Sequence, residues 1–469
     1  DSGEWLAAAV SNGVPHPPGY PLYILILQGW LWLTSIIFPA SDLAWRGNLF
    51  SATCAALSVG VTVLVLSYVL REERWNWLWA LLAGLAWAVS PLLWSQALIT
   101  EVYALHALFV TLLGWALICK DGRPRWLAPI LIVGMGHHLT FLLLMPAVFY
   151  FLWSESTLEP GRRFAQIALI LGGSALISAL IYLRTPWAAS GQPTPPVNWG
   201  YPDNPAGFWW LVSGSAYQGY LFNLPANDLL SRVAGWAYTV TIQYTPVGLG
   251  IALIGLSHLD ASAPRLRNFS ILWILPVSLY SISYYTRDSE IYLLPVGWLM
   301  AIWLGIGLAV LANWLAQRSP AVPWRAITAG LAGVGLAALF TLHLPDLSLR
   351  DDMEAEAYLE TVEAILEPGS IIITTGDPTT FAVWYGAWGA GSLLDAAPDA
   401  VIVNHALYQF DWYRRLLDNL YPNVPDVSVS TMSLIDANLN HRSIYLADKI
   451  SEISDARLEA VGPLWRVVE

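Results

Sequence analysis

Hydrophobic and polar positions divide the chain into long apolar stretches that alternate with short polar connections. An apolar stretch of about twenty residues can cross a bilayer as a helix, because a helix satisfies its own backbone groups there. The pattern therefore predicts an α-helical polytopic membrane protein. The predicted spans cover residues 46–70, 75–95, 98–119, 126–153, 166–184, 229–257, 269–286, 291–316 and 324–343.

Two apolar segments leave a choice of structure. The segment 126–153 is too long for one span and contains the polar sequence GMGHHLT, so it forms either two short helices meeting at a turn or one kinked helix. Counted as two, it brings the prediction to about ten spans. The segment 21–38 is apolar enough to cross the membrane as an ordinary helix. We favour a helix that lies along the outer interface, because of the charges of the loops.

Basic residues are unevenly shared between the two sets of connections. When 126–153 crosses out and back and 21–38 does not cross, one set carries 11 bases and the other carries 4. The positive-inside rule then assigns the base-rich set to the cytoplasm. The outer set consists of Arg46, Arg184, Arg232 and Arg287.

The last part of the chain differs from the rest. Residues 350–469 hold 19 Asp and Glu against 7 Lys and Arg, whereas residues 1–349 hold 15 acids and 15 bases. This predicts a transmembrane domain over 1–349 and a small, acidic, extracytoplasmic α/β domain over 350–469. The strands expected in this domain are 370–375 and 399–405, and the expected helices lie near 378–388 and 406–420.

Composition narrows the class of protein further. Charged residues make up 12% of the chain, against about 25% in soluble domains, and the mean hydropathy is +0.52. The 26 Trp and 21 Tyr suit aromatic belts at two membrane interfaces. The acidic tail argues against nucleic acid as a partner. Cys54 and Cys119 lie in apolar runs and are expected to be small buried hydrophobes.

The predicted outer face collects carboxylates, arginines, histidines and aromatic residues. Ionisable groups near membrane depth are costly and therefore indicate function. Arginine binds phosphate through two parallel hydrogen bonds, and a carboxylate can take a proton from a hydroxyl nucleophile. Such a set suits transfer of a sugar from a lipid phosphate to a hydroxyl. The motifs are DSGE at 1–4, HPPG at 16–19, Arg46, TEVYALH at 100–106, GHH at 136–138, the loop 184–228 and YYTRDSEIYLLP at 284–295.

The order of these motifs resembles the GT-C glycosyltransferases, in particular the protein O-mannosyltransferase-like family and its bacterial type with a C-terminal extracytoplasmic domain. In that family a first transmembrane helix is followed by an acidic pair, a His-Pro-Pro-x-Gly-type elbow, an interfacial helix and an arginine at the head of the next span. RTPW, PPVNWGYPDNP and LEPGSIIITTGDPTTFAVWY extend the resemblance. The corresponding positions here are Asp1, Glu4, His16-Pro17-Pro18-Gly19, 21–38, Arg46 and Asn48.

The resemblance implies a GT-C fold, a further span before Asp1, and an inverting glycosyltransferase that uses a polyprenyl-phosphate sugar. It implies Asp1 as the catalytic base and Glu4 as a support for acceptor binding. The alternative is that Asp1 caps a helix with Glu4 as its capping-type partner. The elbow reads HPPGYP rather than HPPLGK, so the lysine of the classical mannosyltransferases is absent.

Several further residues are candidates for binding the donor phosphate or the substrate, each with a structural alternative. His16 orients a carboxylate or touches phosphate, or it satisfies the elbow turn. Arg46 binds phosphate or pairs with Asp1, or it is an interfacial arginine. His137 and His138 bind phosphate or are polar groups of a turn, and a metal site there lacks a third ligand. The further candidates at the end of one span are Glu101, Tyr103 and His106.

The long loop and the RDSE segment complete the candidates. Arg184 and Arg287 could neutralise the lipid phosphate, and Asp288 and Glu290 are candidates for binding the substrate. The alternative for Arg287 is a salt bridge to Asp288 or Glu290. The loop residues Asn198, Trp199 and Tyr201 are candidate sugar or acceptor contacts, and otherwise they form turns. In the tail, the sequence Gly376-Asp377-Pro378 after a predicted strand is either a ligand loop or a structural turn.

The sequence thus predicts a plasma-membrane glycosyltransferase. We expect transfer of mannose or another hexose from a polyprenyl-phosphate lipid to a hydroxyl of a protein or envelope glycan on the outer face. The cofactor is unknown, because GT-C enzymes differ in metal use and no metal-ligand set is predicted. The alternative is a non-catalytic subunit or scaffold that keeps the fold and binds a partner through its tail. A transporter is a weaker option, because no internal repeat stands out.

Overall fold

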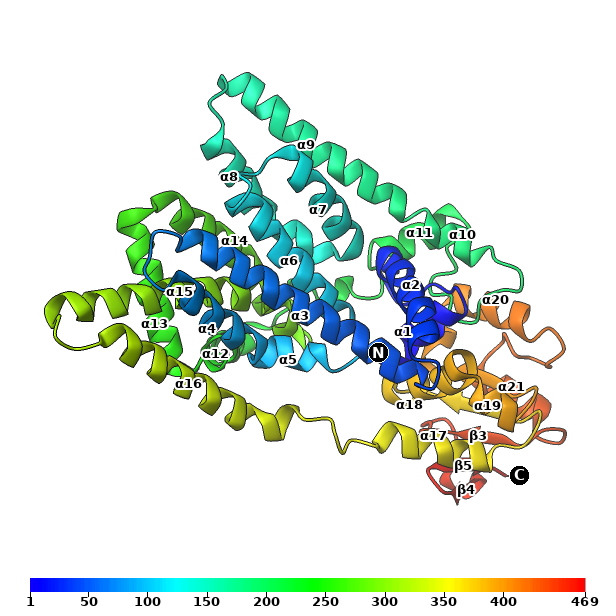
Figure 1. Cartoon of the computed structure of the whole chain (residues 1–469). Coiled ribbons are helices and arrows are strands. Elements are labelled where there is room, and N and C mark those ends of the chain that lie inside the picture. Colours follow the sequence, from blue (N-terminus) through cyan, green and yellow to red (C-terminus); the bar gives the residue numbers. More distant parts are fainter. Residues whose placement is uncertain (469) are drawn as a thin grey trace. The chain divides into compact units, whose positions relative to one another are not determined.

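The structure, a computed structural model, describes residues 1–468 and consists mostly of helices (Figure 1). Its contacts divide the chain into two compact units, each built from segments that are far apart in sequence. We call residues 1–48, 182–216 and 349–469 the mixed unit, since it contains the only sheet among the described residues. We call residues 49–181 and 217–348 the helical unit.

The helical unit is a bundle of apolar helices. Its densest packing joins α13 and α15, where Gly255 and Gly307 face each other's helix. A Cβ on Gly255 would meet the backbone of Trp303. The unit comprises most of α3 (Leu43–Val69), α4 (Asn76–Ala88), α5 (Pro91–Ala97), α6 (Val102–Ile118), α7 (Pro124–His137), α8 (Met145–Glu155), α9 (Pro160–Ile181), α12 (Leu229–Ile242), α13 (Thr245–Ser262), α14 (Pro264–Ser283), α15 (Leu294–Arg318) and α16 (Trp324–Leu347).

Three of the predicted spans are broken, and each break follows from local sequence. Residues 126–153 form α7 and α8, joined by the 3₁₀ turn Leu139–Leu144, which is the first of the two structures that the sequence left open. α4 and α5 meet at 63° where Pro91 begins a new helix. α12 and α13 meet at 86°, because Pro246 has no N–H to continue the hydrogen bonds of α12.

The described helices include four that are long and apolar enough to span a membrane, and the bent pairs α4–α5 and α12–α13 raise this number to six. Three further apolar helices are shorter, among them α2 (Pro21–Ile37). The chain is thus a multi-pass membrane protein, and the count of about ten spans stays a prediction. The interfacial position of α2 and the orientation also stay predictions.

The mixed unit joins the start of the chain to its end. Its first part contains α1 (Ser2–Val10) and α2, and its middle part contains α10 (Arg184–Ala189) and α11 (Pro205–Val212). In Figure 1, α1 (blue) lies beside α18 (yellow-orange), and the two helices are in contact. The tail adds α17 (Glu354–Ile365), α18 (Asp377–Trp384), α19 (Ser392–Ala396), α20 (Asp411–Leu420) and α21 (Thr431–Asn438).

The tail is built around a five-stranded sheet in the order β2-β1-β3-β5-β4. β1 is parallel to both of its neighbours, and β5 pairs antiparallel with β3 and β4. The predicted strands and helices of the tail are all present, since 370–375 contains β1 and 399–405 contains β2. The strands are β1 (Ile371–Thr374), β2 (Val401–Asn404), β3 (Ile444–Leu446), β4 (Leu458–Val461) and β5 (Leu464–Val467).

The division of the chain into a transmembrane domain (1–349) and a tail domain (350–469) stays a prediction. The unit boundary at 348/349 coincides with the change in charge balance. The compact unit to which the tail belongs also contains residues 1–48 and 182–216.

Candidate active site

The opening polar stretch folds into a helix followed by the HPPG elbow, and this arrangement brings Glu4 and His16 together. Glu4 is completely buried. Its Oε1 accepts a hydrogen bond from the His16 backbone N–H at 2.9 Å, and its Oε2 lies 2.5 Å from His16 Nδ1. A buried carboxylate is costly unless it is paired, and His16 supplies both partners. His16 therefore lies against a carboxylate, while its predicted role in orienting a carboxylate or touching phosphate stays a prediction.

The elbow depends on the left-handed backbone of Gly19, which has a φ of +87°. A side chain there would be strained, and its Cβ would also lie 2.8 Å from Leu211 Cδ2. Gly19 N–H donates to the His16 carbonyl at 2.8 Å, so the turn closes directly after the histidine. Pro21 then begins α2.

Aromatic rings surround His16. The centroid of its ring lies 4.8 Å from that of Trp5, 5.6 Å from that of Tyr20 and 6.3 Å from that of Trp199. The first two rings come from α1 and the elbow, whereas Trp199 comes from the long loop. Trp199 was expected from the sequence to contact sugar, whereas Trp5 and Tyr20 were not, because their spacing resembles that of ordinary core positions.

Asp1 stands at the N-cap position of α1, and its side chain is exposed. Its carbonyl accepts the Trp5 N–H, but its carboxylate makes no cap hydrogen bond. Asp1 therefore occupies the N-cap position that the capping alternative expected, but its carboxylate does not cap the helix. Asp1 and Glu4 are three residues apart, about one helical turn, and the first is exposed whereas the second is buried.

The two candidate arginines of the mixed unit, Arg46 and Arg184, both donate to backbone carbonyls. Arg184 is mostly buried, and its guanidinium donates to Gly13 O and Asn12 Oδ1, both at 2.9 Å, so it holds the turn before the elbow. Arg46 donates from Nε and Nη2 to the backbone carbonyl of Ser41. Their predicted roles in binding phosphate stay predictions.

The loop residues Asn198 and Trp199 join the elbow to the tail. Trp199 N–H donates to Val14 O at 2.9 Å, so this loop lies beside the chain that leads into the elbow. The ring of Trp199 lies 5.7 Å from that of Trp412 in α20. Asn198 is buried and donates weakly to Ala189 O at 3.4 Å, and its Oδ1 has no partner among the described residues.

The second group of predicted site residues lies in the helical unit. The ring of His106 lies 4.9 Å from that of His138 and 6.3 Å from that of His137, and Tyr103 lies 5.6 Å from His138. His137 Nε2 donates to Val102 O at 3.0 Å. His138 Nδ1 accepts from Thr140 Oγ1 at 2.7 Å. Glu101 caps α6 by accepting from the N–H of Val102.

The RDSE segment is anchored by Arg232, which the sequence marks only as one of the four bases of the outer set. Arg232 donates to the carbonyls of Ile282, Ser281, Tyr284 and Thr286 and contacts the hydroxyl of Ser289. It thereby satisfies the carbonyls at the end of α14. Arg287, Asp288 and Glu290 are exposed, and within residues 1–468 Arg287 makes no salt bridge to these acids.

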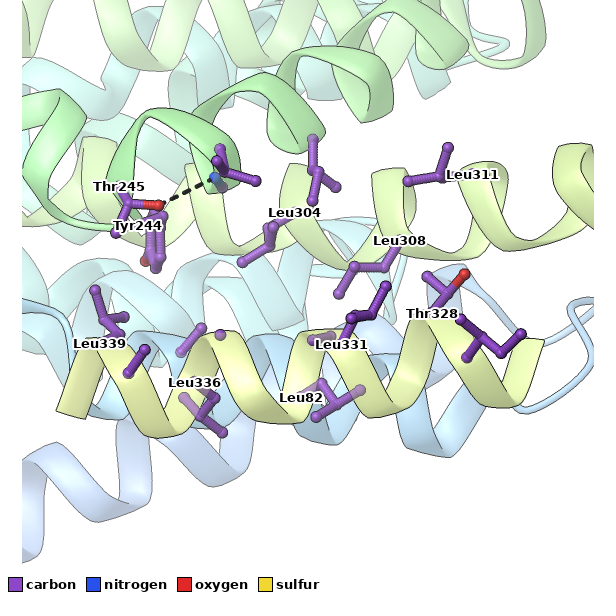
Figure 2. A pocket seen from close by; sticks show the side chains of 18 of the residues that line it. Leu82, Tyr244, Thr245, Leu304, Leu308, Leu311, Thr328, Leu331, Leu336 and Leu339 are labelled. Atoms are coloured by element: carbon purple, nitrogen blue, oxygen red, sulfur yellow. Dashed lines mark hydrogen bonds between the residues drawn. The ribbon is translucent and has the colours of Figure 1, made fainter. Parts of the chain in front are cut away.

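The helical unit also contains a long apolar cavity, between α4, α13, α15 and α16. Figure 2 shows Leu331 of α16 turned toward Leu308 of α15, and Leu304 and Leu339 also line the cavity. The cavity has a volume of about 460 Å³, and Tyr244 and Thr245 line it at the bend between α12 and α13. A second cavity of about 450 Å³ has a mixed lining, to which the polar residues Arg232, Gln243 and Glu290 contribute.

Metal ligands do not gather in either unit. Within residues 1–468, no group of three or more His, Cys, Asp or Glu side chains is arranged to hold an ion, although three histidines approach one another in the helical unit. In the Glu4–His16 pair, the oxygen and nitrogen atoms that could bind a metal are hydrogen-bonded to each other. The residues present therefore do not favour a particular metal.

Known protein families and curated proteins with similar sequences indicate the family that this chain resembles. A family described as the protein O-mannosyl-transferase TMEM260 N-terminal domain matches residues 1–160. Protein O-mannosyl-transferase TMEM260 of Mus musculus is 35% identical over 113 residues, which are 24% of this chain and 15% of that protein. The tmem260 protein of Dictyostelium discoideum is 22% identical over 95% of this chain and 60% of its own length.

These matches confirm the resemblance to the protein O-mannosyltransferase-like family. The chain spans less than two thirds of the length of either curated relative, 15% and 60% respectively.

Solved structures bear on the fold. ArnT from Cupriavidus metallidurans in the apo state is similar with a TM-score of 0.54 and 13% identity, over 95% of this chain and 88% of that one. The same protein bound to undecaprenyl phosphate gives a TM-score of 0.50 and 13% identity, over 87% and 86%. This likeness confirms the predicted GT-C fold with its small C-terminal α/β domain.

Proposed function

We propose that the protein is a membrane glycosyltransferase that transfers a hexose from a polyprenyl-phosphate lipid to a hydroxyl group outside the cytoplasm of the cell. The observation that carries the proposal is the architecture of α1, which exposes Asp1 at its head and buries Glu4 one turn later against His16. Relatives named as O-mannosyl-transferases support the reaction class, and a fold neighbour bound to undecaprenyl phosphate supports the donor class.

In the proposed reaction Asp1 takes the proton from the acceptor hydroxyl. The oxygen then attacks the anomeric carbon of the sugar from the face opposite the phosphate, and the bond between that carbon and the phosphate oxygen breaks. Polyprenyl phosphate leaves with the electron pair, so the configuration of the sugar inverts. Glu4 and His16 hold α1 and the elbow together while this occurs, and the aromatic rings beside His16 offer a surface on which a sugar can pack.

The apolar cavity of the helical unit supports a lipid donor. Its volume of about 460 Å³ and its leucine lining suit several isoprene units, which have no polar group that needs a partner. α16 offers a test with a matched control. Gly335 lines the cavity and Gly333 does not, and a side chain at either position has open space around its Cβ.

The first experiment measures transfer of radiolabelled sugar from a panel of polyprenyl-phosphate sugars, with the full-length protein and its Asp1→Asn variant in membranes. Transfer by the wild type and a loss of at least about a hundredfold in the variant would support the function and the base together. Transfer that survives in Asp1→Asn would exclude Asp1 as the base. If folded wild type transfers from no donor in the presence of native envelope acceptors, the scaffold alternative is favoured.

The second experiment compares Gly335→Phe with Gly333→Phe. We expect Gly335→Phe to raise KM for a long-chain donor and to leave KM for a water-soluble short-chain donor unchanged, because only the tail would be obstructed. Gly333→Phe should leave both values unchanged. Equal effects of the two substitutions would contradict the assignment of the cavity to the lipid tail.

A further inference from the structure

The long loop of the mixed unit places the ring of Trp199 between His16 and the tail. The centroid of this ring lies 6.3 Å from that of the His16 imidazole and 5.7 Å from that of Trp412 in α20. Aromatic rings attract one another at centroid separations of about 4.5–7 Å, so both pairs are in contact. All three residues belong to the mixed unit. Trp199 is half-buried, so part of its ring is accessible to a ligand.

The backbone of Trp199 is bonded to the chain that leads into the elbow. Its N–H donates to Val14 O at 2.9 Å, and the Val14 N–H donates to Val197 O at 2.8 Å. Such bonds fix the position of the backbone but leave the side chain free to choose among its staggered rotamers. The direction of the Trp199 ring therefore depends on the side chains that pack against it.

The start of α20 supplies this packing. The ring of Trp412 lies 5.4 Å from that of Trp210 as well as beside Trp199, and Phe410 stacks on Trp412 at 5.8 Å. Gly200 makes room for the cluster, because it has a φ of +70° and an added Cβ would lie 2.8 Å from Trp210 Cε3. Trp199 thus packs on an aromatic cluster to which the tail contributes two rings.

α20 is itself fixed toward the sheet and toward the loop. Tyr413 Oη accepts the N–H of Asn404 at 2.6 Å, so the helix is bonded to the edge strand β2. On the side of the loop, Asn419 Nδ2 donates to Tyr201 Oη at 3.0 Å, and the Arg415 guanidinium lies 3.9 Å from the centre of the Tyr201 ring. The sheet of the tail therefore determines where α20 meets the loop.

We propose that Trp412 is a positioning residue, which holds the Trp199 ring beside His16 as the platform on which the sugar of the donor packs. This inference rests on the proposed glycosyltransferase function. Of the two substrates, only the donor carries a sugar ring in every form of the proposed reaction, and the C–H groups of a hexose pack on a flat aromatic face. Such a contact binds the ground state and the transition state alike, so its loss raises KM and leaves kcat nearly unchanged.

The test measures KM and kcat for the polyprenyl-phosphate hexose that the wild type uses best, with full-length protein in membranes. Trp412→Leu keeps an apolar side chain and removes the ring. We expect this variant to raise KM for the donor about tenfold, with kcat within about twofold of the wild type. Trp412→Phe restores a ring, and we expect it to return KM to within about twofold of the wild type.

A double variant tests whether Trp412 acts through Trp199. Trp199→Leu removes the platform directly and should raise KM for the donor by about tenfold or more. Addition of Trp412→Leu should raise it no further, because no ring is left to position. Trp199 lies in a loop, so Trp199→Leu tests the platform whatever Trp412→Leu does to folding.

The matched control is Trp465→Leu, which removes a tryptophan from β5, near the edge of the sheet opposite to β2. The ring of Trp465 packs on Lys449, whose Nζ lies 4.2 Å from the ring centroid. KM and kcat of this variant should equal those of the wild type. A thermal unfolding measurement of each variant separates loss of folding from loss of positioning.

The outcomes distinguish this inference from the function on which it rests. Absence of transfer by the wild type from every donor would overturn the proposed function. Transfer by the wild type, with KM unchanged in Trp199→Leu or in folded Trp412→Leu, would overturn only the role of Trp412. Effects on KM that multiply in the double variant, or a rise in KM for the acceptor alone, would also overturn that role, because Trp412 would not then act through Trp199 on the donor.

Discussion

Two clusters of candidate site residues, one in each unit, hold their histidines in different ways. In the mixed unit His16 is bonded twice to a buried carboxylate, so a charge and its partner lie together within an aromatic shell. In the helical unit the bonds of His137 and His138 go to a backbone carbonyl and to a threonine. The first arrangement suits chemistry that moves charge, whereas the second satisfies the broken backbone between α7 and α8. Proximity of histidines alone therefore does not identify the site.

The strongest way to test this comparison is to remove each cluster's carboxylate. We expect Glu4→Ala to abolish transfer and to lower the free energy of unfolding by about 3 kcal/mol, because His16 would lose both bonds in a buried place. Glu101→Ala should lower the free energy of unfolding by about 1 kcal/mol, the cost of a lost helix cap, and should keep most of the transfer activity. Sugar transfer and denaturant unfolding in detergent measure the two effects.

If Glu101→Ala abolished transfer in folded protein while Glu4→Ala did not, the assignment of the two clusters would have to be reversed.

The next largest contrast concerns the histidines. His16→Asn should reduce transfer by about a hundredfold. The backbone N–H would still donate to Glu4 Oε1, but the shorter amide cannot replace the contact of the imidazole with Oε2. His138→Asn should stay within about threefold of the wild type, since Asn accepts from the N–H groups of a helix start as His138 does now. Rates at saturating donor concentration, measured beside thermal stability, check both variants. Similar losses in the two variants would remove the distinction between the clusters.

A smaller effect is expected where α1 meets the tail. Gly3→Ala must push α1 away from α18, because the new methyl group would collide with the Phe381 carbonyl. We expect a loss of activity of about tenfold, with packing strain of about 2 kcal/mol. Gly29→Ala in α2 is the control, since it has open space and removes a flexible residue from a helix. It should be neutral or slightly stabilising, and an inactive Gly29→Ala would show that the assay responds to any change in this unit.

The smallest effect is expected at the outer edge of the mixed unit. Asp203 and Arg415 form an ion pair whose side chains are 31% and 44% exposed, so solvent screens it. Asp203→Asn should lower the free energy of unfolding by less than about 1 kcal/mol and leave transfer unchanged. Salt titration of the unfolding midpoint is a suitable measurement, and the difference between variant and wild type should shrink at high salt.

Several features of this protein follow from sequence alone, because they depend on local periodicity and composition. Long apolar runs identified the helices, and short apolar runs between turns identified β1 and β2. The change in charge balance near residue 349 marked the start of the tail. The order of acidic pair, elbow and arginine led to the GT-C resemblance, which the comparisons confirm.

Only the tertiary structure decided which polar groups meet. Glu4 and His16 are twelve positions apart, and their pairing depends on the reversal of the chain after α1, where Asn12 has a φ of +53° and Gly13 N–H donates to Ala8 O. Arg184 and Arg232 proved to be ligands of backbone carbonyls, since a charge pattern does not reveal where a guanidinium finds its acceptors. Phe381 of the tail meets Gly3 from more than 370 positions away, because the absence of a side chain at Gly3 lets the two backbones touch. Such contacts depend on close packing between distant segments, and periodicity along the chain holds no information about them.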